Sequence, residues 1–341
     1  GGYSGSTSSN PLFAINVDGT DVEGFPYIVG EKIKAGVAVF DMDDNGVDDI
    51  IFGTDSDNIY VLLDNGSIAP NFPIDLGDKI QSEPAVYDTG SERIILTGCK
   101  NNNFYAINYN DGSLRFTIPT GDDIFTSPSF NNNDIYFGSD DGNVYAVDVN
   151  GSLLEGYPLS VGSAIVGSIV FYDITDDGFS NMIFGTNSGE VFAYDNQLSL
   201  LDHFPINYQF PISSSVQIID IDSDSDMEII AGTTGDLIAI DCKNTILEDE
   251  VESWSLFKGD WKRSGYYLSQ ESSFGDCENP QLGDTNCDQI INVIDVISIM
   301  NMVLGDLSMF SDYELWAADL NEDTAIDVFD IITIVNVILD N

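Results

Sequence analysis

The sequence predicts a mainly β protein, a β-propeller of about six blades, followed at its C-terminus by a small all-α module with EF-hand-like loops. Three observations lead to this fold. Residues 11–267 repeat short apolar runs and turns with a period of 40 to 47 residues. A twelve-residue acidic phrase occurs twice near the end of the chain, each time followed by an apolar stretch. Apolar residues make up 43% of the 341 residues and aromatic residues 11%, a composition typical of folded chains.

The N-terminal part is expected to contribute half of a blade. Residues 1–10 form a tail whose first residues, without a starting Met, are typical of a processed product. Residues 13–26 match only the second half of a repeat, while residues 253–257 and 261–267 resemble the missing strands. We therefore expect the two ends of the 11–267 domain to share one blade, because a closed ring has no exposed sheet edge.

Five glycines mark the five full repeats, at spacings of 45, 40, 47 and 47 residues. These glycines are Gly53, Gly98, Gly138, Gly185 and Gly232. A turn and an apolar run rich in β-branched and aromatic residues follow each of them. The runs are nearly continuous rather than alternating, which fits sheets that are packed on both faces by neighbouring blades.

Three of the five repeats carry an acidic phrase between their first two strands. Oxygen-bearing side chains recur at positions 1, 3, 5 and 9, and position 7 offers its main-chain carbonyl, as in a calcium loop of the EF-hand type. The expected ligands are Asp41, Asp43, Asn45, Val47 and Asp49; Asp173, Thr175, Asp177, Phe179 and Asn181; and Asp220, Asp222, Asp224, Asp226 and Glu228. Acidic turns also occur in ordinary hairpins, but three copies in one register favour structural calcium sites. The second and third repeats have lost the pattern and are expected to close without metal.

The two C-terminal phrases follow the same frame and add a carboxylate at position 12. Their expected ligands are Asp284, Asn286, Asp288, Ile290, Asn292 and Asp295, and Asp319, Asn321, Asp323, Ala325, Asp327 and Asp330. Apolar helices are expected over residues 296–304 and 331–339. The chain should thus bind about five calcium ions and depend on them for its fold, because crowded carboxylates repel one another without metal.

The charge restricts the partners and the location. Asp and Glu total 58 against 10 Lys and Arg, a formal net charge of −48. Nucleic acids and anionic membranes need a basic surface, so both are poor partners, and no apolar stretch is long enough for membrane insertion. Calcium is plentiful outside cells, so we expect a secreted protein, extracellular or at the cell surface.

Four cysteines are present. Cys277 and Cys287 flank the start of the first C-terminal loop, and we expect a disulfide between them; reduced packing residues are the alternative. Cys99 and Cys242 lie in different repeats and are expected to be buried thiols. Residues 268–282 form a short linker rich in Ser, Gln and Glu.

Two family resemblances follow from these motifs. The Asp-rich turn, the Ile-Ile-x-Gly-Thr strand, the Val-Tyr-Ala run and the aromatic-Pro pair resemble FG-GAP/VCBS and quinoprotein-like propeller repeats, over about residues 11–267. Residues 283–341 resemble a type I dockerin module. The first resemblance implies a fold and little about function.

The dockerin resemblance implies docking onto a cohesin-like partner. In that family positions 10 and 11 of each loop help to choose the partner, and here they are Val293 and Ile294, and Val328 and Phe329. The two helices are apolar on nearly every side, which indicates an interface. The partner is therefore a cohesin-like protein or another copy of this chain, and a head-to-tail contact between copies would build filaments.

The function expected is that of a secreted, calcium-binding, non-catalytic assembly or scaffold protein. One histidine, His203, and no nucleophile motif speak against Ser-His-Asp or Cys-His catalysis. Two alternatives are open: a glycan-binding or adhesion propeller tethered to a cohesin scaffold, and a polysaccharide-degrading enzyme of a cellulosome-like complex.

Overall fold

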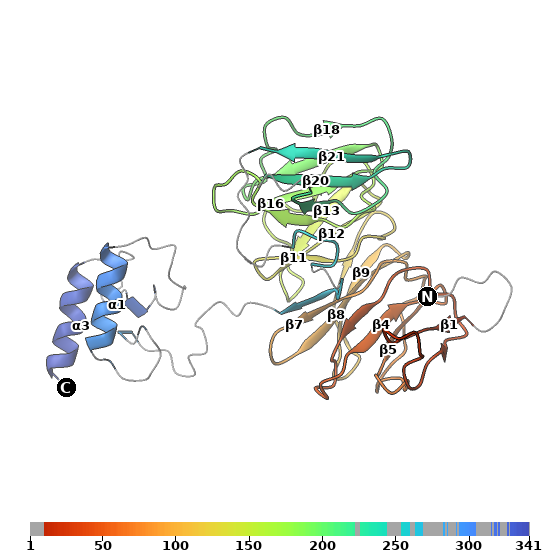
Figure 1. Ribbon diagram of the computed structural model, residues 1–341, viewed down its shortest axis with the longest axis horizontal. Coiled ribbons are helices and arrows are strands. Elements are labelled where there is room, and N and C mark those ends of the chain that lie inside the picture. The colour runs from red at the N-terminus through yellow and green to blue at the C-terminus, as the bar shows by residue number, and fades with distance from the viewer. Residues whose placement is uncertain are drawn as a thin grey trace. The chain divides into compact units, whose positions relative to one another are not determined.

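The computed structural model describes most of the first 268 residues and parts of the remainder. The described residues are 10–221, 226–243, 254–259, 263–268, 282–283, 285, 291, 293–304, 315, 317–318, 320, 326 and 328–340. The chain divides into two compact units, Gly1–Ser269 and Gln270–Asn341. The described part of the first is built of strands, and the described part of the second contains the helices α1 and α3 (Figure 1).

The strands of the first unit are short. They are β1 (Pro11–Leu12), β2 (Tyr27–Ile28), β3 (Ala38–Phe40), β4 (Asp49–Gly53), β5 (Asn58–Leu62), β6 (Ile74–Asp75), β7 (Ala85–Asp88), β8 (Arg93–Cys99), β9 (Asn103–Asn108), β10 (Leu114–Pro119), β11 (Ser129–Asn131), β12 (Asp134–Gly138), β13 (Asn143–Val147), β14 (Leu159–Ser160), β15 (Val170–Tyr172), β16 (Asn181–Gly185), β17 (Glu190–Tyr194), β18 (Ile206–Asn207), β19 (Gln217–Ile219), β20 (Met227–Gly232), β21 (Leu237–Cys242) and β22 (Tyr266–Leu268).

Each of the five predicted repeats forms one antiparallel sheet. Strands β3–β6, β11–β14 and β15–β18 pair in chain order as four-stranded sheets, and β19–β21 form a three-stranded one. In the second repeat, β22 joins β7–β10 by pairing in parallel with β7. The first strands of successive sheets lie next to one another, since β3 contacts β7, β11 contacts β15 and β15 contacts β19. This is the arrangement of propeller blades, and it confirms a mainly β fold.

The repeat glycines have a packing role that the structure explains. Each pairs across the hairpin with the start of the next strand, as Gly138 does with Val144. A Cβ on Gly138 would lie 2.5 Å from Cγ2 of Ile165, a fully buried residue of the link to the next sheet. The repeat glycines of the first, second and fourth sheets are covered in the same way, by Ile80, Ile124 and Ile212 respectively. Glycine is therefore required here by close approach.

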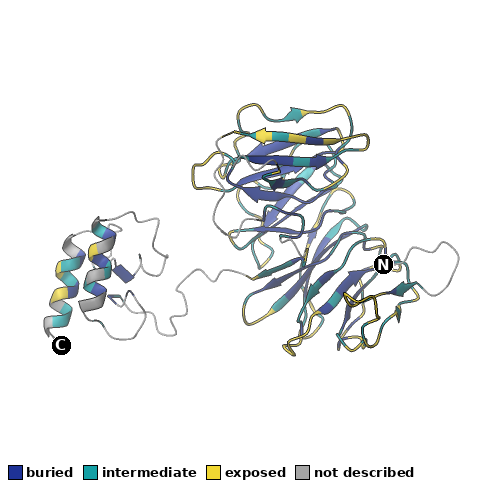
Figure 2. Ribbon diagram, viewed as in Figure 1, coloured by how far each residue is buried: buried dark blue, intermediate teal, exposed yellow. Residues whose placement is uncertain are grey.

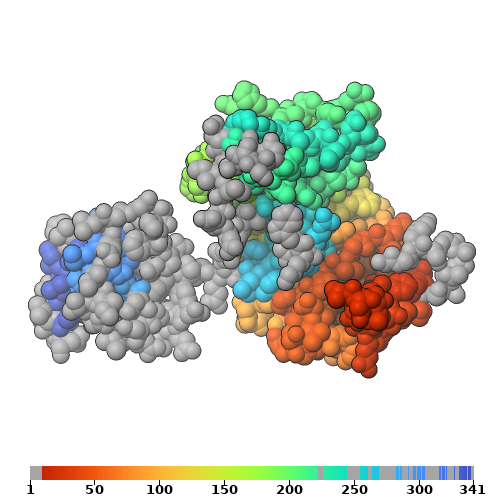
Figure 3. All heavy atoms as spheres, in the orientation of Figure 1, coloured from red at the N-terminus to blue at the C-terminus, as the bar shows by residue number. Residues whose placement is uncertain are grey.

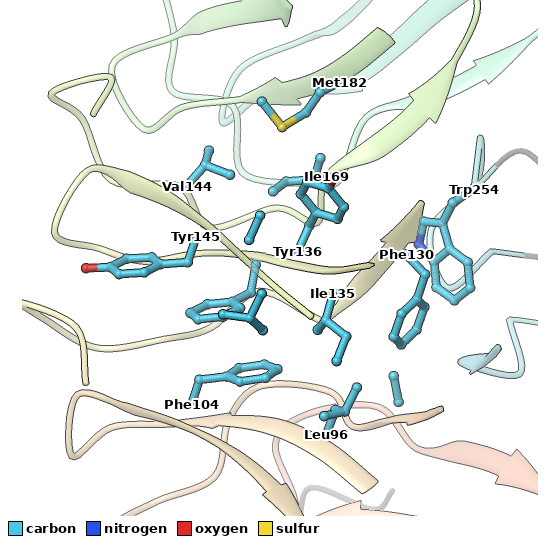
Figure 4. Packing of buried hydrophobic residues seen from close by; sticks show 14 of the residues in the cluster. Leu96, Phe104, Phe130, Ile135, Tyr136, Val144, Tyr145, Ile169, Met182 and Trp254 are labelled. Carbon is cyan, nitrogen blue, oxygen red and sulfur yellow. The ribbon is translucent and has the colours of Figure 1, made fainter. Parts of the chain in front are cut away.

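The core lies between the sheets, and most of the longer strands are largely buried, with β10 and β21 as exceptions, while most turns are exposed (Figure 2). Aromatic rings join successive sheets: Phe104 of β9 stacks on Phe137 of β12 with ring centroids 4.0 Å apart. Figure 4 shows the cluster around these strands, with Trp254 beside Phe130. These two rings meet edge to face at 4.8 Å, which brings residue 254 into the same core as β11.

The N-terminal half repeat pairs with itself. Strands β1 and β2 form a two-stranded sheet. The bridge between Ile15 and Asp21 matches the bridge between Leu62 and Ile68 in the first full repeat. Leu12 belongs to a buried cluster with Phe52 and Tyr60, so the half repeat packs on the first sheet, as the dark red and orange-red atoms of Figure 3 show.

Residues 254–259 and 263–268, named here the axial segment, run along the first strands of four sheets. Main-chain N–H groups of Phe171 and Ile218 donate to the carbonyls of Trp254 and Ser255, both at 3.0 Å. Further along, the N–H groups of Val39 and Val86 donate to Ser264 and Gly265, at 3.0 and 2.7 Å. The segment thus satisfies hydrogen-bonding groups on the free edges of the innermost strands.

This course corrects the expectation that the two ends share one blade. Within the described residues, the axial segment pairs with β3, β7, β15 and β19, and not with β1 or β2. The physical reason is that four buried strand edges need partners, whereas one half blade offers only a single edge at the surface.

The second unit holds α1 (Val293–Leu304) and α3 (Val328–Asp340), which pack against each other. Their shared core includes Ile299, Met302 and Ile334. Helices were expected in both places, and each begins three residues earlier than expected. Of the helices that the structure describes, none is long and apolar enough to cross a membrane.

Candidate metal centres

The first acidic loop, residues 41–49 between β3 and β4, is wound around the side chain of Asp41. Its Oδ1 accepts the N–H of Asn45 at 3.1 Å and its Oδ2 accepts the N–H of Gly46 at 2.7 Å. Oδ1 of Asn45 accepts the N–H of Val47 at 2.8 Å. Asp44 and Gly46 have left-handed φ values of 61° and 87°, and glycine at position 6 adopts such a φ without strain.

Three carboxylates converge in this loop. Oxygen atoms of Asp41, Asp43 and Asp49 lie within 4.8 Å of one another. Asp49 is fully buried, and its oxygens accept the N–H groups of Met42 and Asp64, each at 2.9 Å. Burial raises the pKa of Asp49 to about 6, and the negative charges of Asp43 and Asp41 add to the rise. A divalent cation would relieve this repulsion, and an all-oxygen donor set suits Ca²⁺.

The fourth-repeat loop, residues 173–181, shares three of these hydrogen bonds. Oδ2 of Asp173 accepts the N–H of Gly178 at 2.7 Å, and Oδ1 of Asp177 accepts the N–H of Phe179 at 3.0 Å. Oδ1 of Asn181 accepts the N–H of Ile174 at 2.8 Å, as Asp49 does from Met42. The fold of the loop is therefore shared, but its donors carry less charge.

Position 3 shows the difference most clearly. Thr175 stands where the first loop has Asp43, and its hydroxyl donates to Asp173 at 3.1 Å. Position 9 is the neutral Asn181, fully buried, whose Nδ2 has no hydrogen-bond partner among the described residues. Fewer charged ligands lower calcium affinity, so this loop should bind more weakly than the first.

The fifth-repeat loop, residues 220–228, keeps one diagnostic contact. Oε2 of Glu228 accepts the N–H of Ile221 at 2.8 Å, so position 9 caps position 2 in all three loops. Asp226 lies 3.5 Å from the ammonium of Lys243. Asp222 and Asp224 lie outside the described residues, and Asp220 is half-buried at the start of the loop.

The residues at position 7 in the first and fourth loops, Val47 and Phe179, are 52% and 57% exposed. Apolar side chains in such a place contribute nothing to packing. What these residues can offer to a cation is the main-chain carbonyl, as the sequence predicts.

The second repeat has no acidic loop, and its Arg93 contacts the acidic loop of the first repeat. Arg93 donates to the carbonyl of Met42 at 2.9 Å, pairs with Asp44 and lies 3.5 Å from Asp88. A guanidinium of the second sheet therefore reaches into the first acidic loop. In the third repeat the turn is closed by Asn132 and Asn133, both with positive φ, and the hydroxyl of Tyr87 donates to Asn133.

Most residues of the C-terminal loops lie outside the described residues. These are Asp284, Asn286, Asp288, Ile290, Asn292, Asp319, Asn321, Asp323, Ala325 and Asp327, together with Cys277 and Cys287. The two position-12 carboxylates, Asp295 and Asp330, are described and fully buried in the first turns of α1 and α3. The N–H and hydroxyl of Thr285 donate to Asp295 at 2.9 and 3.1 Å.

The predicted partner-binding residues begin the two helices: Val293 and Ile294 in α1, Val328 and Phe329 in α3. Their side chains lie outside the description. Farther along the helices, Met300, Ile332 and Val335 are exposed. Both helices therefore present apolar surface in addition to their shared core.

Cys99 is buried as expected, whereas Cys242 is only half-buried, and His203 lies in a turn. His203 has a φ of 73° and occupies the turn position of Asn71 (68°) and Gly156 (87°) in other repeats. Cys99 is buried and Cys242 half-buried, both as thiols. Burial raises the pKa of each to about 11, which keeps them protonated and unreactive at neutral pH.

Sequence reasoning missed a cavity of about 380 Å³ between the five repeats and the axial segment, named here the axial cavity. It is lined by the residues that precede the first strand of every sheet and by the axial segment, among them Gln81, Glu83, Ser127, Phe257 and Arg263. The only signal in the sequence is a small or polar residue before each first strand, which also fits an ordinary turn.

Comparison with known proteins supports the fold. No protein-family model and no curated protein matches the chain. The chain is similar to BBS1N in its complex with ARL6DN soaked with lead, with a TM-score of 0.51 and 16% identity over 70% of this chain and 75% of that one. The mercury-soaked complex gives a TM-score of 0.50 and 15% identity over 71% and 75%. BamB from Moraxella catarrhalis gives 0.49 and 14% over 64% and 62%.

At such identities the likeness to BBS1N shows the fold alone. BBS1N is β-propeller-like, and the prediction of a β-propeller-like fold is thereby confirmed.

Proposed function

We propose that this chain is a secreted, non-catalytic assembly protein whose propeller is braced by calcium and whose C-terminal dockerin-like module docks on a partner. The observation that carries the proposal is the first acidic loop, where carboxylate oxygens of Asp41, Asp43 and Asp49 lie within 4.8 Å of one another. The same hydrogen-bonded frame recurs in the fourth-repeat loop. Turns need one or two acids, whereas calcium needs this array of oxygens.

The net charge of −48 supports the same conclusion. Calcium at five loops would cancel ten of these charges where carboxylates are densest. Ions that bind only the folded chain also stabilise it by mass action, so the fold becomes dependent on extracellular calcium.

The docking role rests on the second unit. Asp295 and Asp330 are buried at the helix starts, where position-12 ligands of two calcium loops would stand. Exposed Met300 and Ile332 add apolar surface that a partner could cover. The partner is a cohesin-like protein or the propeller of a neighbouring copy.

The test combines calcium titration with imaging. Calorimetry should give about five calcium ions per chain, and Asp41→Asn with Asp43→Asn should remove one of them. Asp111→Asn, an acidic turn residue outside the loops, is the matched control. Electron microscopy of the purified chain should show polymers in calcium that are lost on chelation and on deletion of residues 283–341, if the partner is another copy.

If the purified chain stays monomeric in calcium and captures a cohesin-like protein, the partner is that protein and not another copy of the chain. Failure to bind any calcium in the first acidic loop would remove the basis of the proposal.

A further inference from the structure

The axial cavity is a built feature rather than a gap between loops. It takes its lining from the same position in all five repeats, just before the first strand of each sheet, and from the axial segment that crosses the ring. The acidic loops follow those first strands, so the cavity and the metal loops lie at opposite ends of them. Its volume of about 380 Å³ falls at the lower end of the range of small-molecule sites, about 300–1,000 Å³.

One lining group has an unmet hydrogen-bonding requirement. Ser127 is 3% exposed, and its Oγ has no hydrogen-bond partner within the described part of the chain. Buried hydroxyls are nearly always paired, and an unpaired one destabilises the protein. A ligand hydroxyl or water in the cavity would satisfy it.

The charges at the cavity leave one cation unbalanced. Glu83 is neutralised by the buried ammonium of Lys258 at 3.4 Å, and Lys34 by Asp55 at 3.3 Å. Arg263 is exposed and forms no ion pair with any described residue. A free guanidinium is notable in a chain with only 10 basic residues and 58 acidic ones. Guanidinium groups bind carboxylates through two parallel hydrogen bonds.

The half-buried ring of Phe257 completes the lining. An aromatic face packs against the C–H face of a sugar ring, while the amide of Gln81 and nearby serine hydroxyls suit its hydroxyl groups. We propose that the axial cavity binds a hexuronic acid, with its carboxylate on Arg263, its ring on Phe257 and one hydroxyl on Ser127. This site goes beyond the assembly role and does not depend on it.

The test is calorimetry on the full chain with glucuronate, galacturonate and, as neutral analogue, glucose. Calcium is kept equal in cell and syringe because uronates also bind calcium. We expect saturable binding of at least one uronate, at least about tenfold tighter than glucose. Arg263→Gln should weaken uronate binding at least about tenfold and leave glucose unaffected. The control is Lys32→Gln, which removes a positive charge that pairs with Asp55. It should change neither the affinity for uronate nor the affinity for glucose.

Ser127→Ala gives an independent readout. It should weaken uronate binding yet leave the melting temperature equal or higher, because it removes a buried hydroxyl that lacks a partner. The proposal is overturned by absence of saturable uronate binding, by equal losses in Arg263→Gln and Lys32→Gln, or by inorganic phosphate binding as tightly as the uronates. None of these outcomes bears on calcium stoichiometry, so the two proposals fail separately.

Discussion

Nη1 of Arg93 in β8 donates a hydrogen bond of 2.9 Å to the main-chain carbonyl of Met42, in the acidic loop of the neighbouring sheet. The same guanidinium pairs with Asp44 and lies over the ring of Phe40. The second repeat has no acidic phrase of its own, and its arginine supplies positive charge to the loop next to it.

Arg93→Met should therefore make the protein more dependent on calcium. Without metal, the loop loses a charge-assisted contact worth about 1–2 kcal/mol, whereas bound calcium compensates for part of the loss. Thermal unfolding with calcium and with chelator should show a wider gap between the two melting temperatures than in the parent. Arg115→Met, which breaks a pair with Glu92 away from the loop, should leave the gap unchanged. An equal difference between the two melting temperatures in both variants would contradict this prediction.

Position 9 should set the relative affinity of the first and fourth-repeat loops. Asn181→Asp gives the fourth-repeat loop the carboxylate that the first loop has in Asp49, and should strengthen calcium binding there by about tenfold or more. Asp49→Asn should weaken the first loop by a similar factor. Both side chains accept a hydrogen bond from the main-chain N–H of position 2 through a side-chain oxygen, so each substitution keeps that hydrogen bond.

Calorimetric titration of the two variants tests this exchange. In chelator, Asn181→Asp should also lower stability, because it places an uncompensated charge in a buried position. An unchanged affinity in both variants would show that position 9 does not face the ion.

Asp134 in β12 should make stability depend on pH. Burial raises its pKa to about 6, and the charge of Asp148 adds to the rise. Since the folded-state pKa lies above the ordinary value of 3.8, the folded state binds the proton more tightly, and its stability falls as pH rises from 3.8 through 6. Asp134→Asn should then be more stable than the parent by about 1 kcal/mol at pH 8, allowing for partial exposure, and equal at pH 4.

Denaturant unfolding at saturating calcium and several pH values measures this difference. The calcium ligands titrate identically in both proteins and cancel. A difference that is constant across pH would refute the assignment to Asp134.

Gly138→Ala should destabilise the propeller by about 1–3 kcal/mol, because the new methyl group meets Ile165. Ile165→Ala alone leaves a cavity and should cost about 2–5 kcal/mol. In the double variant the methyl group enters the vacated space, so the combined loss should be smaller than the sum. Additive losses in a denaturant-unfolding cycle would show that the two residues do not meet.

The sequence revealed those parts of the fold that recur locally. Gly53, Gly98, Gly138 and Gly185 mark the hairpins because the same close approach of an isoleucine excludes a side chain, and at Gly232 the neighbour is Ser214. The frame of the loops that begin at Asp41 and Asp173 could be predicted because the hydrogen bonds within each loop join residues at most seven apart.

The axial segment could not be predicted in the same way. Its apolar and aromatic residues would suit a blade strand or a central strand equally well. Its position depends on hydrogen bonds from the N–H groups of residues such as Phe171 and Val86, which lie more than 80 residues away in the sequence. The role of Arg93 and the convergence on the axial cavity likewise depend on which repeats become neighbours. Such relationships have no local signature.

The parallel pairing of β22 with β7 has a mechanical consequence for the end of the first unit. Tension applied beyond Leu268 would pull along the direction of the paired strands, so their hydrogen bonds would be loaded together in shear rather than unzipped singly. Because the axial segment also bonds to the first strands of three other sheets, the load would be shared among several sheets instead of peeling one strand away. The chain therefore leaves the first unit through a strand that is held by hydrogen bonds in a segment shared with several sheets.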